Sequence, residues 1–153
     1  MEPRTRLRRP YAYEPDYEIY RDLMHYDPVQ ARWADAFESA LNRLRLVRSV
    51  AEVEKGWKPE YHTGVILAGE KFLADGSLPE MQKDYHERVR AADMEGTGFA
   101  RSCKEHKKPW LVFRGVSDFG EKKRRKGWKL IAALSAATAV HAFIAHDYRP
   151  IDG

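Results

Sequence analysis

Two carboxylates in the second half of the chain each follow an apolar segment. Glu95 comes directly after Ala91–Met94, and Asp118 comes two residues after the apolar run that ends at Val116. Two acids at neighbouring strand ends can cleave a glycosidic bond, because one accepts hydrogen bonds from sugar hydroxyls while the other donates a proton to the leaving base. The same spacing also fits acids that only cap strand ends or form ion pairs. Spacing alone leaves both interpretations open.

The elements that would position these acids alternate between strands and helices. The pattern predicts strands over Tyr61–Leu67, Ala91–Met94 and Pro109–Val116. It predicts helices over residues 16–24, 28–46, 79–89, 96–106 and 128–147. The helix 28–46 is expected to start with Asp27 as its N-cap and Pro28 in its first turn. Its expected apolar face recurs at three- and four-residue spacing: Val29, Trp33, Phe37, Ala40, Leu41 and Leu44.

This order indicates an α/β fold with a largely parallel sheet between two layers of helices. In such sheets ligands bind outside the carboxyl ends of the strands, where Glu95 and Asp118 are expected. We predict an irregular N-terminal segment over residues 1–26 and one partial α/β domain over residues 27–149.

Composition is typical of a globular protein, with 43% hydrophobic and 33% charged residues among 153. The single cysteine, Cys103, and the lack of an apolar leader after the N-terminal arginines favour the cytoplasm. The apolar segment Trp128–Ala145 contains Lys129 and His141 and is expected to be a core helix rather than a membrane span.

A net charge of +4 makes nucleic acid an alternative partner. The cations gather among the N-terminal arginines and in the basic run Lys122–Lys126. We expect these runs to be solvated loops, because no RNA- or DNA-binding motif accompanies them.

Two other chemistries are not supported by the sequence. The tripeptide Asp118-Phe119-Gly120 matches a protein-kinase motif, but the kinase catalytic loop, Gly-rich loop and strand lysine do not precede it. The six histidines form no metal-binding pattern, and Cys103 with His106 would supply only two ligands. No metal and no cofactor are expected, and Cys103 is expected to pack in the interior.

Three ordered motifs carry a family resemblance. "GVILAGEKFLADG" at residues 64–76, "AADMEGTGFARSCKEHKKPWLVFRGVSD" at 91–118 and the Ala-rich helix that follows resemble the C-terminal half of the nucleoside phosphorylase superfamily. They are most similar to its methylthioadenosine/S-adenosylhomocysteine nucleosidase branch. The resemblance implies a three-layer helix/sheet/helix fold, of which this chain would hold the C-terminal half. It also implies cleavage of the glycosidic bond of a purine nucleoside or nucleotide.

The resemblance implies a role for each matching residue. Phe72 would pack on the purine, and Leu73 would lend backbone to the base. Met94 would lie under the ribose, and Glu95 would bind its 2′- and 3′-hydroxyls. Asp118, paired with Ser117, would protonate or hydrogen-bond purine N7 as the bond lengthens. Arg114 is expected to form a structural ion pair.

The first sixty residues differ from the family pattern. They contain only Gly56, so no glycine-rich strand end is present to bind phosphate or to position water. We therefore expect a fragment, a truncated reading frame or a chain that depends on another subunit, with an open sheet edge that favours a homo-oligomer. The sequence does not separate hydrolysis from phosphorolysis with a phosphate co-substrate. It also leaves two non-catalytic alternatives: a nucleoside- or nucleotide-binding module, and a basic nucleic-acid-interaction module.

Overall fold

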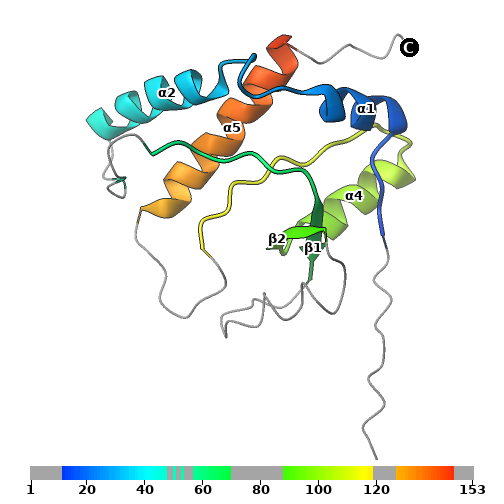
Figure 1. Cartoon of the computed structure of the whole chain (residues 1–153). Coiled ribbons are helices and arrows are strands. Elements are labelled where there is room, and N and C mark those ends of the chain that lie inside the picture. The colour runs from blue at the N-terminus through cyan, green and yellow to red at the C-terminus, as the bar shows by residue number, and fades with distance from the viewer. Residues whose placement is uncertain are drawn as a thin grey trace, which may run out of the picture.

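The computed structural model describes residues 12–47, 50, 53, 57–69, 88–118 and 127–146. In these ranges the elements are helices α1 (Tyr17–His25), α2 (Trp33–Val47), α4 (Gly96–Glu105) and α5 (Trp128–His146), and strands β1 (Val65–Ala68) and β2 (Val89–Asp93) (Figure 1). Helices α2 and α5 pack against each other, and α4 lies beside the two strands. This combination of helices with a small parallel sheet agrees with the predicted α/β class.

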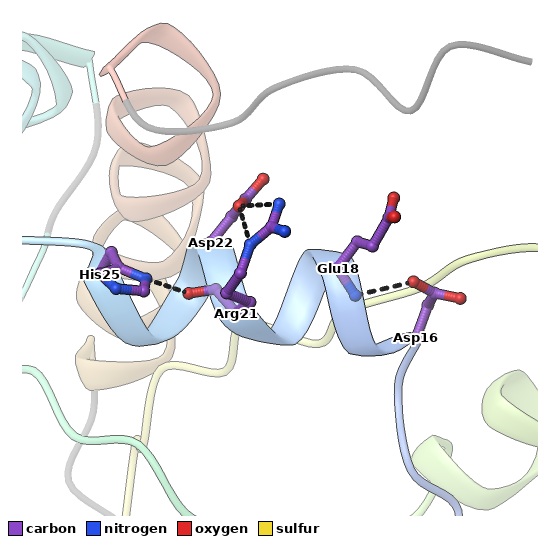
Figure 2. A network of polar contacts seen from close by, with 5 residues as sticks. All are labelled: Asp16, Glu18, Arg21, Asp22 and His25. Atoms are coloured by element: carbon purple, nitrogen blue, oxygen red, sulfur yellow. Dashed lines mark hydrogen bonds and ion pairs between the residues drawn. The ribbon is translucent and has the colours of Figure 1, made fainter.

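Helix α1 begins and ends with local polar contacts, which explains why so short a segment is helical (Figure 2). At its N-terminus, Asp16 Oδ1 accepts a hydrogen bond from the Glu18 backbone N–H at 3.0 Å. At the other end, His25 Nδ1 lies 2.8 Å from the Arg21 carbonyl oxygen. The helix predicted over residues 16–24 is confirmed to within one residue.

Helix α2 starts later than the sequence predicts. The Asp27 carboxylate accepts from the backbone N–H groups of Val29 and Gln30, so it caps a turn over residues 28–32 rather than the helix itself. Arg32 then takes a left-handed backbone conformation with φ of 51°, and α2 begins at Trp33. Val29 was wrongly assigned to the apolar face, since it lies in the turn and is 82% exposed.

The remainder of the predicted α2 face forms the core with α5. Phe37 and Leu41 are buried against Ile131 of α5. At the start of the helix, the Trp33 ring N–H donates to the Ser135 carbonyl at 3.2 Å and to Thr138 Oγ1 at 3.1 Å. The three- and four-residue spacing therefore predicted the packing of α2 correctly from Trp33 onward.

An aromatic cluster joins segments that are distant in sequence. Tyr26 packs edge-on against Tyr61 and Phe143, with ring centroids 5.2 Å and 5.6 Å apart. Trp33 also lies edge-on to Tyr61 at 6.2 Å. The cluster connects the end of α1, the start of α2, the chain before β1 and the end of α5.

The two strands run parallel, with Ala68 opposite Asp93 at their carboxyl ends. The Gly69 backbone N–H donates to the Asp93 carbonyl at 3.0 Å, which closes this end of the pair. Both strands were predicted, with shifted bounds: the first begins four residues later than expected, and the second begins two residues earlier, at Val89. The predicted helix over residues 79–89 lies mostly outside the described residues.

The strand predicted over Pro109–Val116 is wrong, because residues 108–118 join no ladder in the described part of the chain. Leu111 and Phe113 instead pack into the aromatic cluster. Gly115 lies so close to α5 that a Cβ built on it would collide with the Ala132 carbonyl oxygen. An apolar run indicates that a segment is buried, but not whether its backbone pairs with a strand or its side chains pack on a helix.

Helix α5 is mostly apolar, although it contains Lys129, His141 and His146. Among the described residues it is the one helix whose length and composition would allow it to cross a bilayer. The core helix of a soluble protein passes the same test, so this finding is weak evidence for a membrane. One side of α5, including Ile131, Ala139, Ala142 and Phe143, is buried within the structure.

We predict that Gly115→Ala lowers the free energy of unfolding by about 1–3 kcal/mol, because the added methyl group overpacks the contact with the α5 backbone. Gly98→Ala in α4 is the matched control. No atom lies within 4 Å of a Cβ at that position, and alanine is the better helix former, so the control should be neutral or stabilising. Urea unfolding monitored by circular dichroism measures both, and an equal effect at the two positions would contradict the close approach.

We also predict a pH effect from the aromatic cluster. Burial, with a smaller contribution from Tyr26, raises the pKa of Tyr61 from 10.0 to about 12. The folded state therefore favours the neutral phenol, so this contribution to stability is complete below pH 10 and is lost as the pH rises toward 12. Tyr61→Phe should lose less unfolding free energy than the wild type between pH 9 and pH 11.5. Tyr17→Phe, at a 75% exposed position, should behave as the wild type does.

Candidate functional site

The candidate site lies at the carboxyl end of β2, where the chain turns tightly into α4. Asp93, the last residue of the strand, has a side chain that is 1% exposed. Its Oδ1 accepts a hydrogen bond from the Gly96 backbone N–H at 2.9 Å, so Asp93 supplies the cap that Glu95 does not provide. A Cβ at position 96 would lie 2.8 Å from the same oxygen, which explains the glycine.

Because Asp93 holds this turn, the two residues inside it project outward. The Glu95 side chain is 73% exposed, and Met94 is 46% exposed. Both side chains are therefore accessible at the surface of this turn. The Glu95 side chain makes no capping hydrogen bond to α4.

Arg114 joins this turn to the segment that carries the second acid. Its Nη2 lies 3.2 Å from Glu95 Oε2, and its Nη1 lies 3.7 Å from Asp93 Oδ2. The predicted ion pair of Arg114 is therefore confirmed, with two carboxylate partners. The contact brings residue 114 beside the carboxyl end of β2 although no backbone ladder connects the two segments.

Ser117 and Asp118 form a local pair, in which the Ser117 hydroxyl donates to Asp118 Oδ2 at 3.0 Å. Both side chains are half-buried. The serine thus orients one carboxylate oxygen and occupies one of its acceptor sites. This hydrogen bond restricts the orientation of the Asp118 carboxylate.

The segment from Leu111 to Gly115 contacts α5 and the aromatic cluster as well as the turn after β2. Leu111, Phe113 and Gly115 face the core and α5. Arg114 points toward Glu95. The structure therefore brings Arg114 to Glu95, and Asp118 follows Arg114 by four residues along the same segment. Phe72 and Leu73 lie outside the described residues.

Sequence analysis missed the role of Asp93, although a signal was present. An aspartate three residues before a glycine that opens a helix fits a side-chain cap, and Asp93 stands in that relation to Gly96. Glu95, two residues later, was the predicted site residue because it directly follows the predicted apolar strand.

A surface pocket between α2 and α5 contains none of these side chains. Its lining residues are Ala31, Arg32, Asp35, Ala36, His141, Ala142 and His146. Within the same described ranges, no three histidine, cysteine, aspartate or glutamate side chains are grouped so that they could hold a metal ion.

We predict that Asp93→Ala lowers the unfolding free energy by about 1–3 kcal/mol, because it leaves the Gly96 N–H without its acceptor and removes a buried partner of Arg114. The control is Glu105→Ala, which removes an exposed carboxylate paired with Arg101 and should cost about 0–1 kcal/mol. Chemical denaturation of both variants tests this expectation. Equal losses would mean that the Asp93 contacts are no stronger than a surface ion pair.

Sequence comparisons relate this chain to a family of known proteins. The profile of the Phosphorylase superfamily matches residues 4–145, which extends further toward the N-terminus than the motifs that carried the resemblance. ATP nucleosidase Cap17 of Escherichia coli (strain KTE188) is 29% identical over 86 residues, covering 56% of this chain and 17% of that protein.

Two further relatives are named 5'-methylthioadenosine/S-adenosylhomocysteine nucleosidase. The protein from Psychromonas ingrahamii is 28% identical over 76 residues, which are 50% of this chain and 33% of that protein. The protein from Staphylococcus aureus (strain JH9) is 24% identical over 102 residues, which are 65% of this chain and 45% of that protein. No solved structure matches the chain.

In each of these relatives the chain spans less than half of the length. The profile match, in contrast, covers nearly all of the chain and includes both carboxylates and the arginine between them. The chain belongs to the phosphorylase superfamily, among whose members the relatives found here are named as nucleosidases.

Proposed function

We propose that this chain forms the base- and ribose-binding part of a site that cleaves the glycosidic bond of a purine nucleoside or nucleotide. The observation that carries the proposal is the contact of Arg114 with Glu95, because it joins the segment of Asp118 to the turn after β2. The relatives are named for ATP and for 5′-substituted adenosine compounds, so the adenosine moiety is the shared chemistry.

Each acid has one role in this mechanism. Glu95, exposed and held from one side by Arg114, accepts hydrogen bonds from the ribose 2′- and 3′-hydroxyls. Asp118 in its protonated form donates its proton to purine N7 as the bond from C1′ to N9 breaks and its electron pair moves onto the base. The Ser117 hydroxyl donates to Asp118 Oδ2 and so orients this carboxylate for its role. A well-placed general acid supplies about 10²–10⁴-fold in rate.

The sugar requires an acceptor to complete the reaction. Water would add hydroxide to C1′ and release a proton that restores the protonated form of Asp118, whereas phosphate would yield the sugar 1-phosphate. The nucleosidase names of the relatives favour water. We propose that the group activating this acceptor lies outside the described residues, in the remaining part of the three-layer fold or in a second copy of the chain.

We propose Met94 and Phe72 as the apolar contacts of this site, with Met94 under the ribose and Phe72 on the purine beside Leu73. The exposure of Met94 next to Glu95 supports its role. The assignments of Phe72 and Leu73 rest on the family resemblance alone.

A nucleoside- or nucleotide-binding module without turnover is the second candidate, because the chain spans less than half of each nucleosidase that it matches. Calorimetry with adenosine, run alongside chromatographic assay of adenine, separates the two functions. Binding with adenine release supports the enzyme, and binding without release in water or in phosphate supports the module.

For the enzyme, we predict that Asp118→Asn lowers the rate of adenine release by about 10²–10⁴-fold while adenosine binding changes little, because only proton donation is lost. Glu95→Gln should weaken adenosine binding while leaving the already weak binding of 2′,3′-dideoxyadenosine unchanged. Asp35→Asn on α2 is the matched exposed control and should match the wild type. Full turnover by Asp118→Asn would exclude Asp118 as the acid.

A further inference from the structure

The surface pocket outside the candidate site lies where the start of α2 meets the end of α5 (Figure 1). It encloses about 310 Å³, which falls among ligand sites of about 300–1,000 Å³. Its apolar lining consists of three alanines, and its polar lining consists of Arg32, Asp35, His141 and His146. Four polar side chains from two helices thus meet at one small concavity.

Arg32 lines the pocket from a strained backbone conformation. Its φ of 51° lies in the left-handed region, which favours glycine or asparagine over arginine, and such strain is common at ligand sites. The Arg32 side chain is fixed by Asp35, since Nε donates to Asp35 Oδ2 at 2.9 Å. Among the described residues the two Nη groups make no further polar contact, so this part of the guanidinium fork remains for a ligand.

The two histidines of the pocket differ from the other described histidines. Nδ1 of His25 and Nδ1 of His106 lie 2.8 Å and 2.9 Å from backbone carbonyl oxygens, and His62 lies 3.4 Å from a glutamate carboxylate. Within the ranges that the structure describes, His141 and His146 make no polar contact. Two imidazoles are therefore available to a ligand from the α5 side of the pocket.

The charges of these groups indicate an anion whose binding depends on pH. Arg32 and Asp35 compensate each other, so the four groups carry no net charge while both imidazoles are neutral. Imidazole gains its proton between about pH 8 and about pH 5, and it then donates from both ring nitrogens. The described residues contain no group of three histidine, cysteine, aspartate or glutamate side chains that could hold a metal ion. A guanidinium fork with two protonated imidazoles instead matches a tetrahedral oxyanion.

We propose that this pocket is a second ligand site, which binds a phosphate group through Arg32, His141 and His146 when the two imidazoles are protonated. The phosphate group is either a free ion or part of a nucleotide, since both present the same oxygens. The inference goes beyond the proposed function and does not depend on it, because the pocket contains none of the residues assigned to cleavage of the glycosidic bond.

The test measures sulfate binding to the full chain by calorimetry at about pH 5.5 and about pH 8. Sulfate replaces phosphate because it remains a dianion over this range, so a change in affinity reports on the protein. We expect the wild type to bind about fivefold or more tightly at the lower pH, because only there are the imidazoles charged. His141→Gln/His146→Gln should remove this difference, because glutamine donates a hydrogen bond but takes up no proton.

Arg32→Asn tests the guanidinium. Asparagine tolerates the left-handed backbone, so the substitution removes the charge without adding strain. We expect about tenfold weaker sulfate binding at both pH values, because charge-assisted hydrogen bonds to the anion are lost.

The matched controls are Arg43→Asn, at an exposed position of α2, and His62→Gln/His106→Gln, which removes two imidazoles outside the pocket. Both should bind sulfate as the wild type does at each pH. Circular dichroism melts establish that all variants are folded.

Competition against sulfate in the wild type identifies the source of the phosphate group. Displacement by adenosine 5′-monophosphate but not by adenosine indicates a nucleotide. Displacement by inorganic phosphate alone indicates a free ion.

The inference is overturned if the wild type binds no sulfate at the lower pH, or if the pocket variants bind it as the wild type does. It is also overturned if the control variants lose as much affinity as the pocket variants. None of these results affects the proposed function, which is tested with adenosine and with Glu95 and Asp118. Conversely, sulfate binding that depends on the pocket would remain informative if adenosine were neither bound nor cleaved.

Discussion

The contact of Arg114 with Asp93 and Glu95 is the interaction on which the candidate site depends. Among the described residues, this side-chain contact joins residues 108–118 to the end of β2. The two carboxylates differ in burial and therefore in the contacts they make. Asp93 is almost fully enclosed and accepts from the backbone of α4, while Glu95 is mostly exposed and makes the shorter contact with Arg114, at 3.2 Å. An ion pair with this much exposure contributes only about 0–1 kcal/mol, so its importance is in positioning rather than in stability.

Stability comes from the apolar contacts around α5. Ile131 packs with Phe37 and Leu41 on one part of the helix, and Phe143 joins the aromatic cluster on another. These contacts also hold the segment that precedes Asp118, because Phe113 packs on Phe143 with ring centroids 5.6 Å apart. The helix core and the candidate site are thus connected through the segment of residues 108–118, which packs on α5 through Phe113 and Gly115 and carries Arg114 to Glu95.

Family membership and geometry support different parts of the functional argument. The superfamily match and the nucleosidase names of the relatives support a glycosidic-bond chemistry, but the chain spans less than half of each of those proteins. The geometry adds the arrangement of the carboxylates about Arg114, which motif order cannot provide. The pocket between α2 and α5 contains none of the candidate-site residues.

The sequence by itself determined the elements whose signal is local. The periodicity of Trp33, Phe37 and Leu41 predicted the buried face of α2, and the short strand before the Gly96 helix was predicted with shifted bounds. It also predicted Arg114 as an ion-pair residue. Only the tertiary structure decided that residues 109–116 pack on α5 instead of joining the sheet, that Val29 is exposed, and that Asp93 holds the turn. Such outcomes depend on which distant surface a segment meets, and an apolar pattern records that a residue is buried but not the partner that buries it.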